Sequence, residues 1–373
     1  MARTQDALYA DIDLELSWSE RELPERERTK HVHRLHPYLG KFIPQLVETL
    51  LARYVPAGGR VLDPFAGSGT TLVQSLENGR EATGIDVAAF NCLLMRVKTA
   101  RYNEFVLERE IRDALARVEP VEDDPPTAEG YIGQWFAPAA AAELLAFRDV
   151  LADYEHADVL RVVLARAARS ARRTAHFDLE FPREPQAGPY WCHKHKRECR
   201  PVEHAEHFIR RYALDTLARI KAFGRVRSRD ARASVVHGDA RTAVIDGGPF
   251  DAVITSPPYP GLIDYHEQHR YAYELLGLDD RRERELGAAA RGTSKAAIEE
   301  YVTGIAAVLS RVRTVLRRGA PVCIVVNDRR ALYPEILERA GLRLDERLER
   351  HVNRRTGRRA GEYFESVLVC RAA

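Results

Sequence analysis

Residues 61–71, VLDPFAGSGTT, place an acidic side chain and a Gly-x-Gly turn between the end of an apolar strand and the start of a helix. Gly67 and Gly69 carry no Cβ, so the backbone of the turn can pass close under a ligand. The helix expected from Thr70 offers backbone N–H groups that have no partner within the helix. This order of strand, glycine turn and helix predicts a site for a nucleotide-like ligand at the carboxyl edge of an open α/β sheet.

The residues around the turn narrow the choice of ligand. The turn lacks the Gly-Lys-Ser/Thr ending of a phosphate-binding loop, and Leu72 stands where the third glycine of a dinucleotide fingerprint would fall. The carboxylate of Asp63 suits a cationic or hydroxyl-rich ligand better than a pyrophosphate. About twenty residues on, a strand over 82–86 ends in Asp86, where an acid would bind ribose hydroxyls. S-adenosylmethionine fits, because it has an ammonium, a sulfonium and a ribose but no phosphate.

A second motif lies at residues 250–259, FDAVITSPPY, where an apolar strand runs directly into Ser-Pro-Pro-Tyr. The two prolines fix the backbone and donate no hydrogen bonds, which leaves nearby carbonyl groups free as acceptors. Ser256 adds a hydroxyl group and Tyr259 adds an aromatic ring. Acceptors beside a stacking surface suit a planar base with an exocyclic amino group. The alternative is an ordinary proline turn after a strand.

Together these two motifs resemble the S-adenosylmethionine-dependent DNA methyltransferases that methylate amino groups, at cytosine N4 or adenine N6. The resemblance covers residues 31–104 and 233–370. It implies an α/β fold with a Rossmann-like, seven-stranded methyltransferase sheet. Ser-Pro-Pro-Tyr looks more like the cytosine-N4 members, because adenine-N6 members more often carry Asn or Asp before the prolines.

The resemblance implies direct methyl transfer, in which the enzyme aligns the amino nitrogen with the methyl group. Ser256 Oγ and the carbonyl of Pro257 are expected to accept hydrogen bonds from the amine, with Pro258 completing the turn and Tyr259 stacking on the base. The base must leave the duplex to reach such a site. Cytosine-C5 chemistry is disfavoured, because it uses a thiolate in a Pro-Cys pair and no cysteine here follows proline.

The cofactor residues expected from the motifs and the resemblance come from several segments. Tyr38 and Lys41 belong to a segment that would close over the methionine end of the cofactor, although a helix-capping loop is the alternative. Asp239 follows the strand over 233–236 and would contact the adenine amino group. The full predicted set is Tyr38, Lys41, Asp63, Pro64, Phe65, Gly67, Gly69, Thr70, Thr71, Asp86, Asp239 and Thr255.

The chain divides into a charged N-terminal arm at 1–30, a methyltransferase core at 31–104 and 233–373, and a helical basic insertion at 105–232. Helices are expected over 138–150, 160–171 and 204–223. Residues 161–232 hold 18 Lys and Arg against 8 Asp and Glu, although the whole chain carries a net charge of only +2. This excess predicts a DNA-binding, target-recognition region, with a solvated helix surface as the alternative. The insertion precedes the third strand, which is early for the family.

Cys192-x2-His195-x3-Cys199, with His204 or His207 further on, could bind a structural zinc ion tetrahedrally. The spacing differs from that of a standard zinc finger. The alternative is a basic aromatic loop in which Tyr190 or Trp191 packs against DNA.

The composition restricts the remaining choices. The sequence contains no run of eighteen apolar residues, so no membrane span is expected. No signal core opens the chain, and the five scattered cysteines indicate reduced thiols. The expected location is therefore the cytoplasm. The expected partner is double-stranded DNA; a cognate restriction enzyme and the oligomeric state stay open. The alternatives are adenine-N6 methylation, methylation of an RNA amino group, a small-molecule methyltransferase and a non-catalytic nucleic-acid-binding protein.

Overall fold

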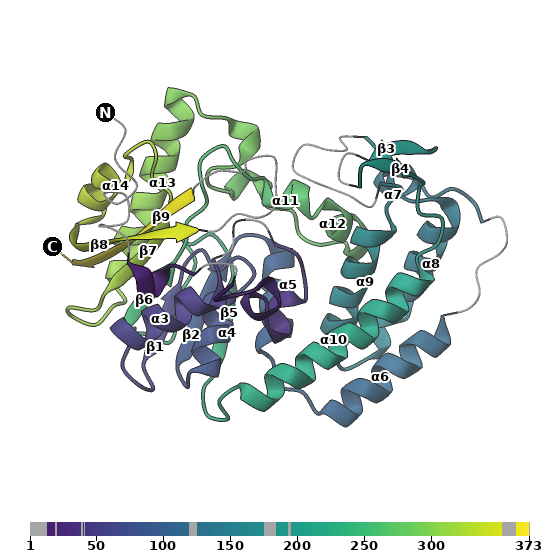
Figure 1. Cartoon of the computed structure of the whole chain (residues 1–373), viewed down its shortest axis with the longest axis horizontal. Helices are drawn as coiled ribbons and strands as arrows, with labels where there is room; N and C mark the ends of the chain where they lie inside the picture. Colours follow the sequence, from purple (N-terminus) through teal and green to yellow (C-terminus); the bar gives the residue numbers. More distant parts are fainter. Residues whose placement is uncertain are drawn as a thin grey trace.

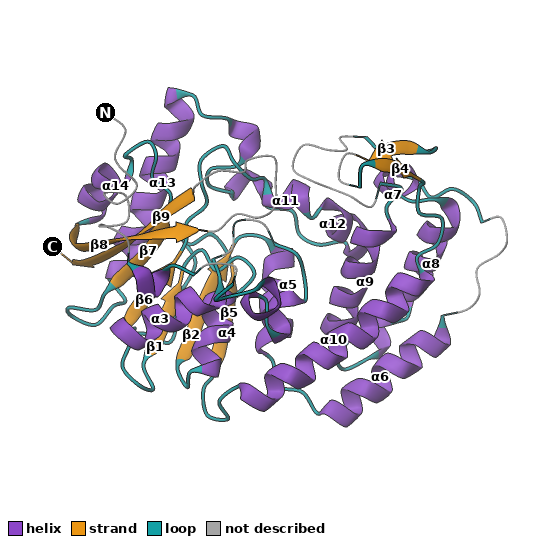
Figure 2. Cartoon of the chain, in the orientation of Figure 1, coloured by secondary structure: helices purple, strands orange, loops and turns teal. Residues whose placement is uncertain are grey.

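The computed structural model describes residues 13–18, 21–38, 40, 42–118, 125–174, 184–192, 195–352 and 363–372. The described residues form a layered region built on a large sheet and a helical region that carries a two-stranded hairpin (Figures 1 and 2). The expected architecture, a seven-stranded α/β sheet with a mostly helical insertion, is therefore confirmed.

The strands of the large sheet lie in the order β5-β2-β1-β6-β7-β9-β8. The first five are parallel, β9 is antiparallel to β7, and β8 is antiparallel to β9. The order reverses between β1 and β6, and ligands of open α/β sheets bind at the carboxyl ends of the strands beside such a point. The strands are β1 (Arg60–Asp63), β2 (Glu81–Asp86), β5 (Ala233–His237), β6 (Ala252–Thr255), β7 (Val322–Val326), β8 (Leu342–Val352) and β9 (Tyr363–Ala372).

Helices cover both faces of this sheet, and alternate side chains of each strand supply the two cores. Val61 and Ala252 pack with α3 on one face, where α4 and α5 also lie, while Leu62 and Val253 pack with α13 and α14 on the other. Burial on both faces explains why the central strands are continuously apolar. These helices are α3 (Pro44–Tyr54), α4 (Thr70–Glu77), α5 (Ala89–Thr99), α13 (Lys295–Arg313) and α14 (Tyr333–Ala340).

The insertion shares one apolar core with the sheet-covering helices α4 and α5. Leu76 and Phe90 belong to the same buried cluster as Leu160 and Ile220 of the insertion, so the insertion is packed onto the core. β5 is the third strand of the large sheet along the chain, and the elements from α6 to α10 precede it. Its elements are α6 (Glu104–Arg117), α7 (Gly130–Trp135), α8 (Pro138–Asp149), η3 (Leu151–Asp153), α9 (Ala157–Ala171), β3 (Tyr190–Cys192), β4 (Arg197–Cys199) and α10 (Glu206–Val226).

Two further groups of short elements flank the core. The first precedes α3, and the second follows the Ser-Pro-Pro-Tyr segment. They are η1 (Leu14–Leu16), α2 (Glu25–Arg28), η2 (His31–Arg34), α11 (Tyr265–Gln268), α12 (Arg270–Leu276), η4 (Arg282–Arg284) and η5 (Ala289–Arg291).

The described part of the N-terminal segment is fastened to the edge of the sheet. The backbone N–H of Asp13 donates to the carbonyl of Glu349 at 2.8 Å, and Trp18 forms a β-bridge with Val352. Leu16 is fully buried against α3 and the sheet. The charge of residues 1–30 had indicated a separate arm, but the apolar side chains within it anchor this part of the segment. None of the described helices is both long and apolar enough to cross a membrane.

Candidate functional site

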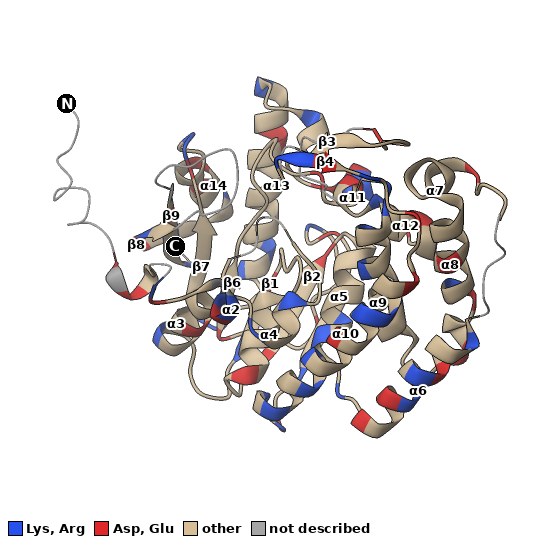
Figure 3. Ribbon diagram, turned by 45° about the vertical axis from the view of Figure 1, so that its right-hand side comes forward, with Lys and Arg blue, Asp and Glu red and all other residues tan. Residues whose placement is uncertain are grey.

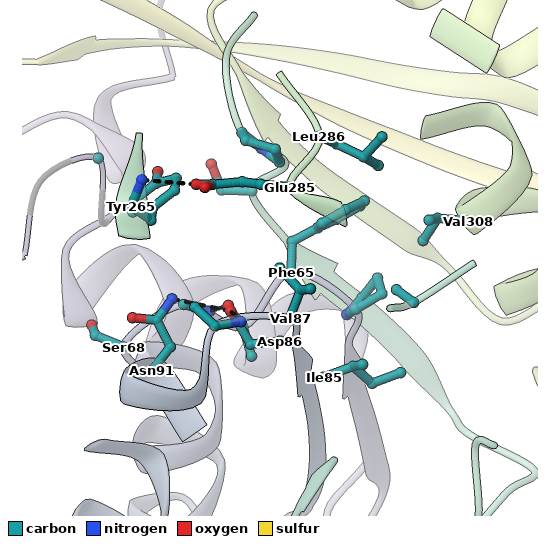
Figure 4. A pocket seen from close by; sticks show the side chains of 18 of the residues that line it. Phe65, Ser68, Ile85, Asp86, Val87, Asn91, Tyr265, Glu285, Leu286 and Val308 are labelled. Carbon is teal, nitrogen blue, oxygen red and sulfur yellow. Dashed lines mark hydrogen bonds between the residues drawn. The ribbon is translucent and has the colours of Figure 1, made fainter. Parts of the chain in front are cut away.

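A pocket with about 830 Å³ of open space lies at the carboxyl edge of the sheet, beside the point where the strand order reverses. Its walls come from the segments that follow β1, β2, β5 and β6, together with α11 and residues 284–286. In Figure 4, Asp86 and Asn91 lie on one side, Tyr265 and Glu285 on another, and Phe65 projects between them. The pocket combines apolar side chains with a few convergent polar groups, as small-molecule sites do.

The glycine turn forms the floor of this pocket and is held from two sides. Gly67 and Gly69 have positive φ angles of 51° and 81°, which favour glycine. The Gly67 N–H donates to Asp86 Oδ2 at 2.8 Å. A Cβ on Gly67 would lie 3.0 Å from the Tyr38 hydroxyl oxygen, so the Tyr38 ring would have to shift by a few tenths of an ångström to make room for it.

Tyr38 is partly buried at the pocket, where its ring stacks on two other rings. The ring stacks on Tyr265 with centroids 5.3 Å apart and on His269 at 5.8 Å. Its hydroxyl oxygen accepts a hydrogen bond from Asn91 Nδ2 at 3.1 Å. Burial raises the pKa of Tyr38 well above its ordinary value, so this hydroxyl stays protonated at neutral pH.

Asp86 ends β2 and connects the glycine turn to α5. Its second oxygen, Oδ1, accepts hydrogen bonds from the Ala88 N–H at 2.8 Å and from Asn91 Nδ2 at 3.1 Å. Burial raises the pKa of Asp86 to about 7, although the hydrogen bonds from Ala88, Asn91 and Gly67 favour its ionised form. Its charge is therefore sensitive to pH near neutrality.

Two buried polar atoms on the pocket wall have no hydrogen-bond partner among the residues that the structure describes. They are Ser68 Oγ, on the glycine turn, and Asn91 Oδ1, on α5. Buried polar groups in proteins are normally hydrogen-bonded. Apolar side chains of Ile85, Leu286 and Val308 line the rest of the wall. A ligand with a flat apolar ring and several hydrogen-bonding groups, such as S-adenosylmethionine, fits this lining.

Asp63 connects the two sequence motifs from behind the pocket. Its side chain is 1% exposed, and Oδ1 accepts a hydrogen bond from Thr255 Oγ1 at 2.6 Å. Oδ2 accepts one from Thr71 Oγ1 at 2.7 Å, and the Phe65 N–H also donates to Oδ1 at 3.1 Å. Burial raises the pKa of Asp63 to about 6, against the effect of these hydrogen bonds. The carboxylate therefore holds the end of β1 to α4 and to the end of β6.

The Ser-Pro-Pro-Tyr segment enters the pocket where β6 ends. The Ser256 hydroxyl donates to the carbonyl of Val325 in β7 at 2.9 Å. A hydroxyl has one proton and two acceptor lone pairs, so Ser256 Oγ keeps its acceptor capacity for a ligand. The Tyr301 hydroxyl donates to the carbonyl of Pro258 at 2.9 Å, and this bond braces the proline turn from α13.

Glu285 is a buried acid in the wall opposite Asp86, at 4% exposure. Its Oε1 accepts from the Tyr265 N–H at 2.8 Å, and Oε2 lies 3.0 Å from His266 Nδ1. The carboxylate therefore anchors the start of α11, which carries the ring stacked on Tyr38.

Comparisons with known proteins identify the family. Residues 5–95 match a family model described as DNA methylase. The Type II methyltransferase M.MjaII of Methanocaldococcus jannaschii is 35% identical over a 430-residue alignment that covers 92% of this chain and 81% of that protein. The chain belongs to the amino-methylating DNA methyltransferases. The Type II methyltransferase M.MvaI of Kocuria varians matches this methyltransferase more locally, with 36% identity over 84 residues, or 22% of this chain and 18% of that protein.

A solved structure, TrmN from Thermus thermophilus, matches with a TM-score of 0.33 and 13% identity, over 90% of this methyltransferase and 50% of that chain. A score this low carries no information about function.

Many, but not all, of the site residues predicted from sequence line the pocket of this methyltransferase. The predicted residues that do not line the pocket are Asp63, Gly69, Thr71, Thr255, Pro257 and Tyr259. Lys41 lies outside the described residues. The prediction that the Asp63 carboxylate faces the ligand therefore differs from its observed position behind the wall. The predicted residues that do line the pocket are Tyr38, Pro64, Phe65, Gly67, Thr70, Asp86, Asp239, Ser256 and Pro258.

Sequence reasoning did not include several lining residues of this methyltransferase in the predicted set. Asn91 lies in the first turn of the helix that follows Asp86, and this place near the helix start indicates a residue that borders the cofactor. No sequence pattern indicated that Glu285 belongs to the site, because residues 281–285, RRERE, are typical of an exposed loop.

Asp239 has a carboxylate already engaged by Arg241. Arg241 Nε and Nη2 lie 2.9 and 2.6 Å from its two oxygens. Although burial acts to raise it, these hydrogen bonds hold the pKa of Asp239 below its ordinary value. The carboxylate of Asp239 therefore stays ionised at neutral pH.

The predicted metal residues separate into two groups. Ligand atoms of Cys192, His195 and Cys199 all lie within 4.8 Å of one another on the β3–β4 hairpin. His204 is elsewhere, because its Nδ1 lies 2.8 Å from Glu143 Oε1 of α8. The assignment of His204 as a ligand is therefore corrected, and three of the proposed ligands come together.

Part of the basic charge of the insertion is used inside the protein. Arg166 is 7% exposed and contacts Asp215 and Thr216, while Lys221 pairs with Glu108 at 2.6 Å. Figure 3 shows Lys and Arg interspersed with Asp and Glu along α6. On the hairpin, in contrast, Arg197 is exposed, as is the adjoining Arg200. The charge that can meet DNA is therefore smaller than the count of basic residues indicates.

Proposed function

We propose that this methyltransferase transfers a methyl group from S-adenosylmethionine to the N4 amino group of cytosine in double-stranded DNA. The observation that carries the proposal is the hydrogen bond from the Ser256 hydroxyl to the carbonyl of Val325 at 2.9 Å. This bond directs the Ser256 proton away from the pocket. The oxygen is then an acceptor, as the N–H groups of a target amine require.

The cofactor is proposed to lie on the glycine turn. Asp86, Ser68 and Asn91 provide acceptors for its ribose hydroxyls and ammonium group, and Asp239 provides an acceptor for the adenine amino group. Ile85, Leu286 and Val308 provide the apolar surface for the adenine ring. The bound cofactor supplies a methyl group on a sulfonium, which is a good leaving group and needs no activation by the protein.

The residues of this chain then act mainly by positioning. The lone pair of an exocyclic amine is delocalised into its ring, which makes the nitrogen a weak nucleophile. Hydrogen bonds from the amine to Ser256 Oγ and to the Pro257 carbonyl draw the nitrogen toward tetrahedral geometry and localise that lone pair. Once the nitrogen carries the methyl group, it releases one N–H proton to solvent. Tyr259 stacks on the flipped base. Alignment of two bound reactants accounts for a large part of the rate enhancement in such reactions.

Serine before the two prolines favours cytosine over adenine. The resemblance to the cytosine-N4 members rests on this residue, whereas Asn or Asp more often precedes the prolines in adenine-N6 members. Adenine N6 is the second candidate, because its amino group presents the same donors to Ser256 and the same ring to Tyr259.

The β3–β4 hairpin is proposed to contact the DNA. Trp191 is 56% exposed on a strand next to Arg197 and Arg200. An exposed indole beside guanidinium groups suits a surface that meets phosphates and base edges. Both curated relatives are named Type II methyltransferases, and we therefore propose a cognate restriction endonuclease as the partner in the cell.

A competition between nucleic acids tests the function. The protein is incubated with S-adenosylmethionine carrying a labelled methyl group and equal masses of unmethylated genomic DNA and total RNA. We expect label in DNA only, and an initial rate of incorporation about 10²-fold or more lower when Ser256→Ala replaces the wild type. Label in RNA would favour the RNA alternative. Transfer to neither polymer, with tight DNA binding retained, would favour a non-catalytic DNA-binding protein.

We also propose that Cys192, His195 and Cys199 bind a structural zinc ion. Two strands of three residues are too short for a hairpin to be stable in water without further support. Two thiolates and an imidazole within 4.8 Å of one another supply three of the four ligands of a tetrahedral structural zinc site.

Metal analysis of the purified protein tests the zinc proposal. We expect one zinc per chain, lost in Cys192→Ser and Cys199→Ser. The control variants His204→Ala and His207→Ala should keep the metal, because neither residue belongs to the cluster. A wild-type protein without zinc after growth in zinc-supplemented medium would contradict the proposal, including the case where the thiols form a disulfide.

A further inference from the structure

An exposed leucine stands on a tight turn directly after the Ser-Pro-Pro-Tyr segment. The backbone N–H of Leu262 donates to the carbonyl of Tyr259 at 3.3 Å, which closes a four-residue turn. Pro260 and Gly261 occupy its central positions, and Gly261 has φ of 69°. Proline followed by glycine with positive φ is typical of a type II turn. The turn therefore has a defined shape that presents the side chain of Leu262.

This turn is fixed to its surroundings on both sides. The Gly261 N–H donates to the Gly287 carbonyl at 2.9 Å, and the Ala289 N–H donates to the Ile263 carbonyl at 3.2 Å. A Cβ on Gly261 would lie 2.5 Å from Thr293 Cγ2, so the backbone passes tightly against its neighbour. Ile263, the next residue, is 7% exposed. Leu262 is thus held outward by a rigid support.

The position of the turn sets Leu262 apart from the other exposed apolar residues. Pro258 and Tyr265 both line the pocket, and they bracket the turn in sequence, so the turn stands at the pocket rim. Leu262 is 42% exposed there. The other large apolar side chains with high exposure among the described residues lie on α6, β3, α10, the loop after β5 and β8: Phe105, Trp191, Leu214, Val226, Val244 and Leu344.

We propose that Leu262 is a wedge that enters the DNA stack and fills the space left by the flipped target base. This inference rests on the proposed function, because a base that is methylated in this pocket must leave the duplex. Proteins that distort DNA commonly insert apolar side chains such as leucine between base steps. A leucine on a rigid turn, four residues from the Pro258 that lines the pocket, is placed to occupy the vacated position while the base is held at Ser256.

The wedge makes Leu262 a positioning residue, so its effect depends on the cost of flipping. A target base without a pairing partner can be extruded from the duplex at a lower cost in free energy. Loss of the wedge should therefore slow methylation of a matched duplex and leave an unpaired target largely unaffected. A residue that merely supports the fold would affect both substrates equally.

The experiment uses the full chain and two duplexes that carry the recognition site mapped from methylated genomic DNA. One duplex is fully matched, and the other has an abasic site opposite the target base. Single-turnover methylation by Leu262→Ala should fall by about tenfold or more on the matched duplex and stay within about twofold of wild type on the second, because extrusion there is cheap. Leu262→Met, which keeps an apolar side chain of similar length, should restore most of the rate on the matched duplex.

Leu344→Ala is a matched control, because Leu344 is 43% exposed, against 42% for Leu262, and lies on β8 at the edge of the sheet. It should behave as wild type on both duplexes. An unchanged rate for Leu262→Ala on the matched duplex, or an equal loss on both duplexes, would overturn the wedge. Failure of the proposed function is distinguishable, since wild type would then methylate neither duplex.

Discussion

Thr255 donates a 2.6 Å hydrogen bond from its hydroxyl to Oδ1 of Asp63, which joins the ends of two neighbouring strands. β1 leads into the glycine turn and β6 leads into Ser-Pro-Pro-Tyr, so this bond sets the position of the cofactor motif relative to the catalytic motif. Thr71 binds the other oxygen of the same carboxylate at 2.7 Å. One buried acid therefore fixes a strand, a helix start and a second strand.

Asp63→Ala should destabilise the protein and misalign its two motifs. It would leave the hydroxyls of Thr71 and Thr255 buried without their acceptor, and we expect the free energy of unfolding to fall by about 3 kcal/mol. Asp63→Asn should be milder, because it keeps one acceptor oxygen and removes a buried charge. Chemical denaturation of Asp63→Asn, Thr255→Val and the double variant measures the coupling, and strictly additive losses would contradict a direct interaction.

Ser256→Ala should reduce the rate of methyl transfer without weakening cofactor binding. Removal of one aligned hydrogen-bond group at a reacting centre costs about 10²–10³ in kcat. Single-turnover kinetics would give the rate, and calorimetry with S-adenosylmethionine would give the affinity. Thr255→Ser, one residue earlier, is a useful control because it keeps the hydroxyl on Asp63. A wild-type kcat for Ser256→Ala would show that methyl transfer does not depend on Ser256 Oγ as a hydrogen-bond acceptor.

Cofactor affinity should rise with pH through neutrality. Burial raises the pKa of Asp86 to about 7, so below that pH the carboxyl is protonated in the free protein. A ligand that donates hydrogen bonds to the carboxylate favours its ionised form, and its Kd should therefore improve by about tenfold between pH 6 and pH 8. Asp239, whose pKa is held low by Arg241, contributes no such dependence in this range.

Equilibrium dialysis of S-adenosylmethionine across this pH range provides the measurement. Asp86→Asn should bind more weakly at pH 8 and show a flat profile. A pH dependence that survives in Asp86→Asn would assign the titration to another group.

Glu285→Ala should loosen the wall that carries Tyr265. The substitution leaves the Tyr265 N–H and His266 Nδ1 without their acceptor, at a cost of about 1–3 kcal/mol for each buried group. We expect a lower melting temperature and a higher KM for S-adenosylmethionine, because the Tyr265 ring that stacks on Tyr38 loses its support. Glu285→Gln retains one acceptor oxygen, so its melting temperature and its KM should lie between those of Glu285→Ala and those of the wild type. Equal melting temperatures for Glu285→Ala and wild type would show that this anchor contributes little.

The local patterns in the sequence predicted most of the sheet, because its strands and turns are set by neighbouring residues. The glycine turn, the acid at the end of β2 and the strand before Ser256 are all visible within ten residues. The shared core of the insertion was not visible, because Phe90 and Leu160 meet only after the chain has folded. The pairing of Trp18 with Val352 at the sheet edge depends in the same way on a residue more than 300 positions away.

The candidate site was predictable where a residue contacts its neighbours in sequence and less so elsewhere. Asp63 was assigned to the ligand on the basis of its charge, but its partner Thr255 lies 192 residues further along. Glu285 lies in a charged stretch, and only its contacts with Tyr265 and His266 explain its burial. Lys41 lies outside the described residues, so its predicted contact with the cofactor stays a prediction.

The most direct test of the central claim is the chemical identity of the methylated base. Unmethylated duplex DNA is treated with the protein and S-adenosylmethionine carrying a labelled methyl group, digested to nucleosides and separated with mass detection. The serine that precedes the two prolines predicts label in N4-methylcytosine, and incorporation should fall by about 10²-fold or more with Ser256→Ala. Label in N6-methyladenine would contradict the choice of base, and an unlabelled DNA digest would contradict the proposed function as a whole.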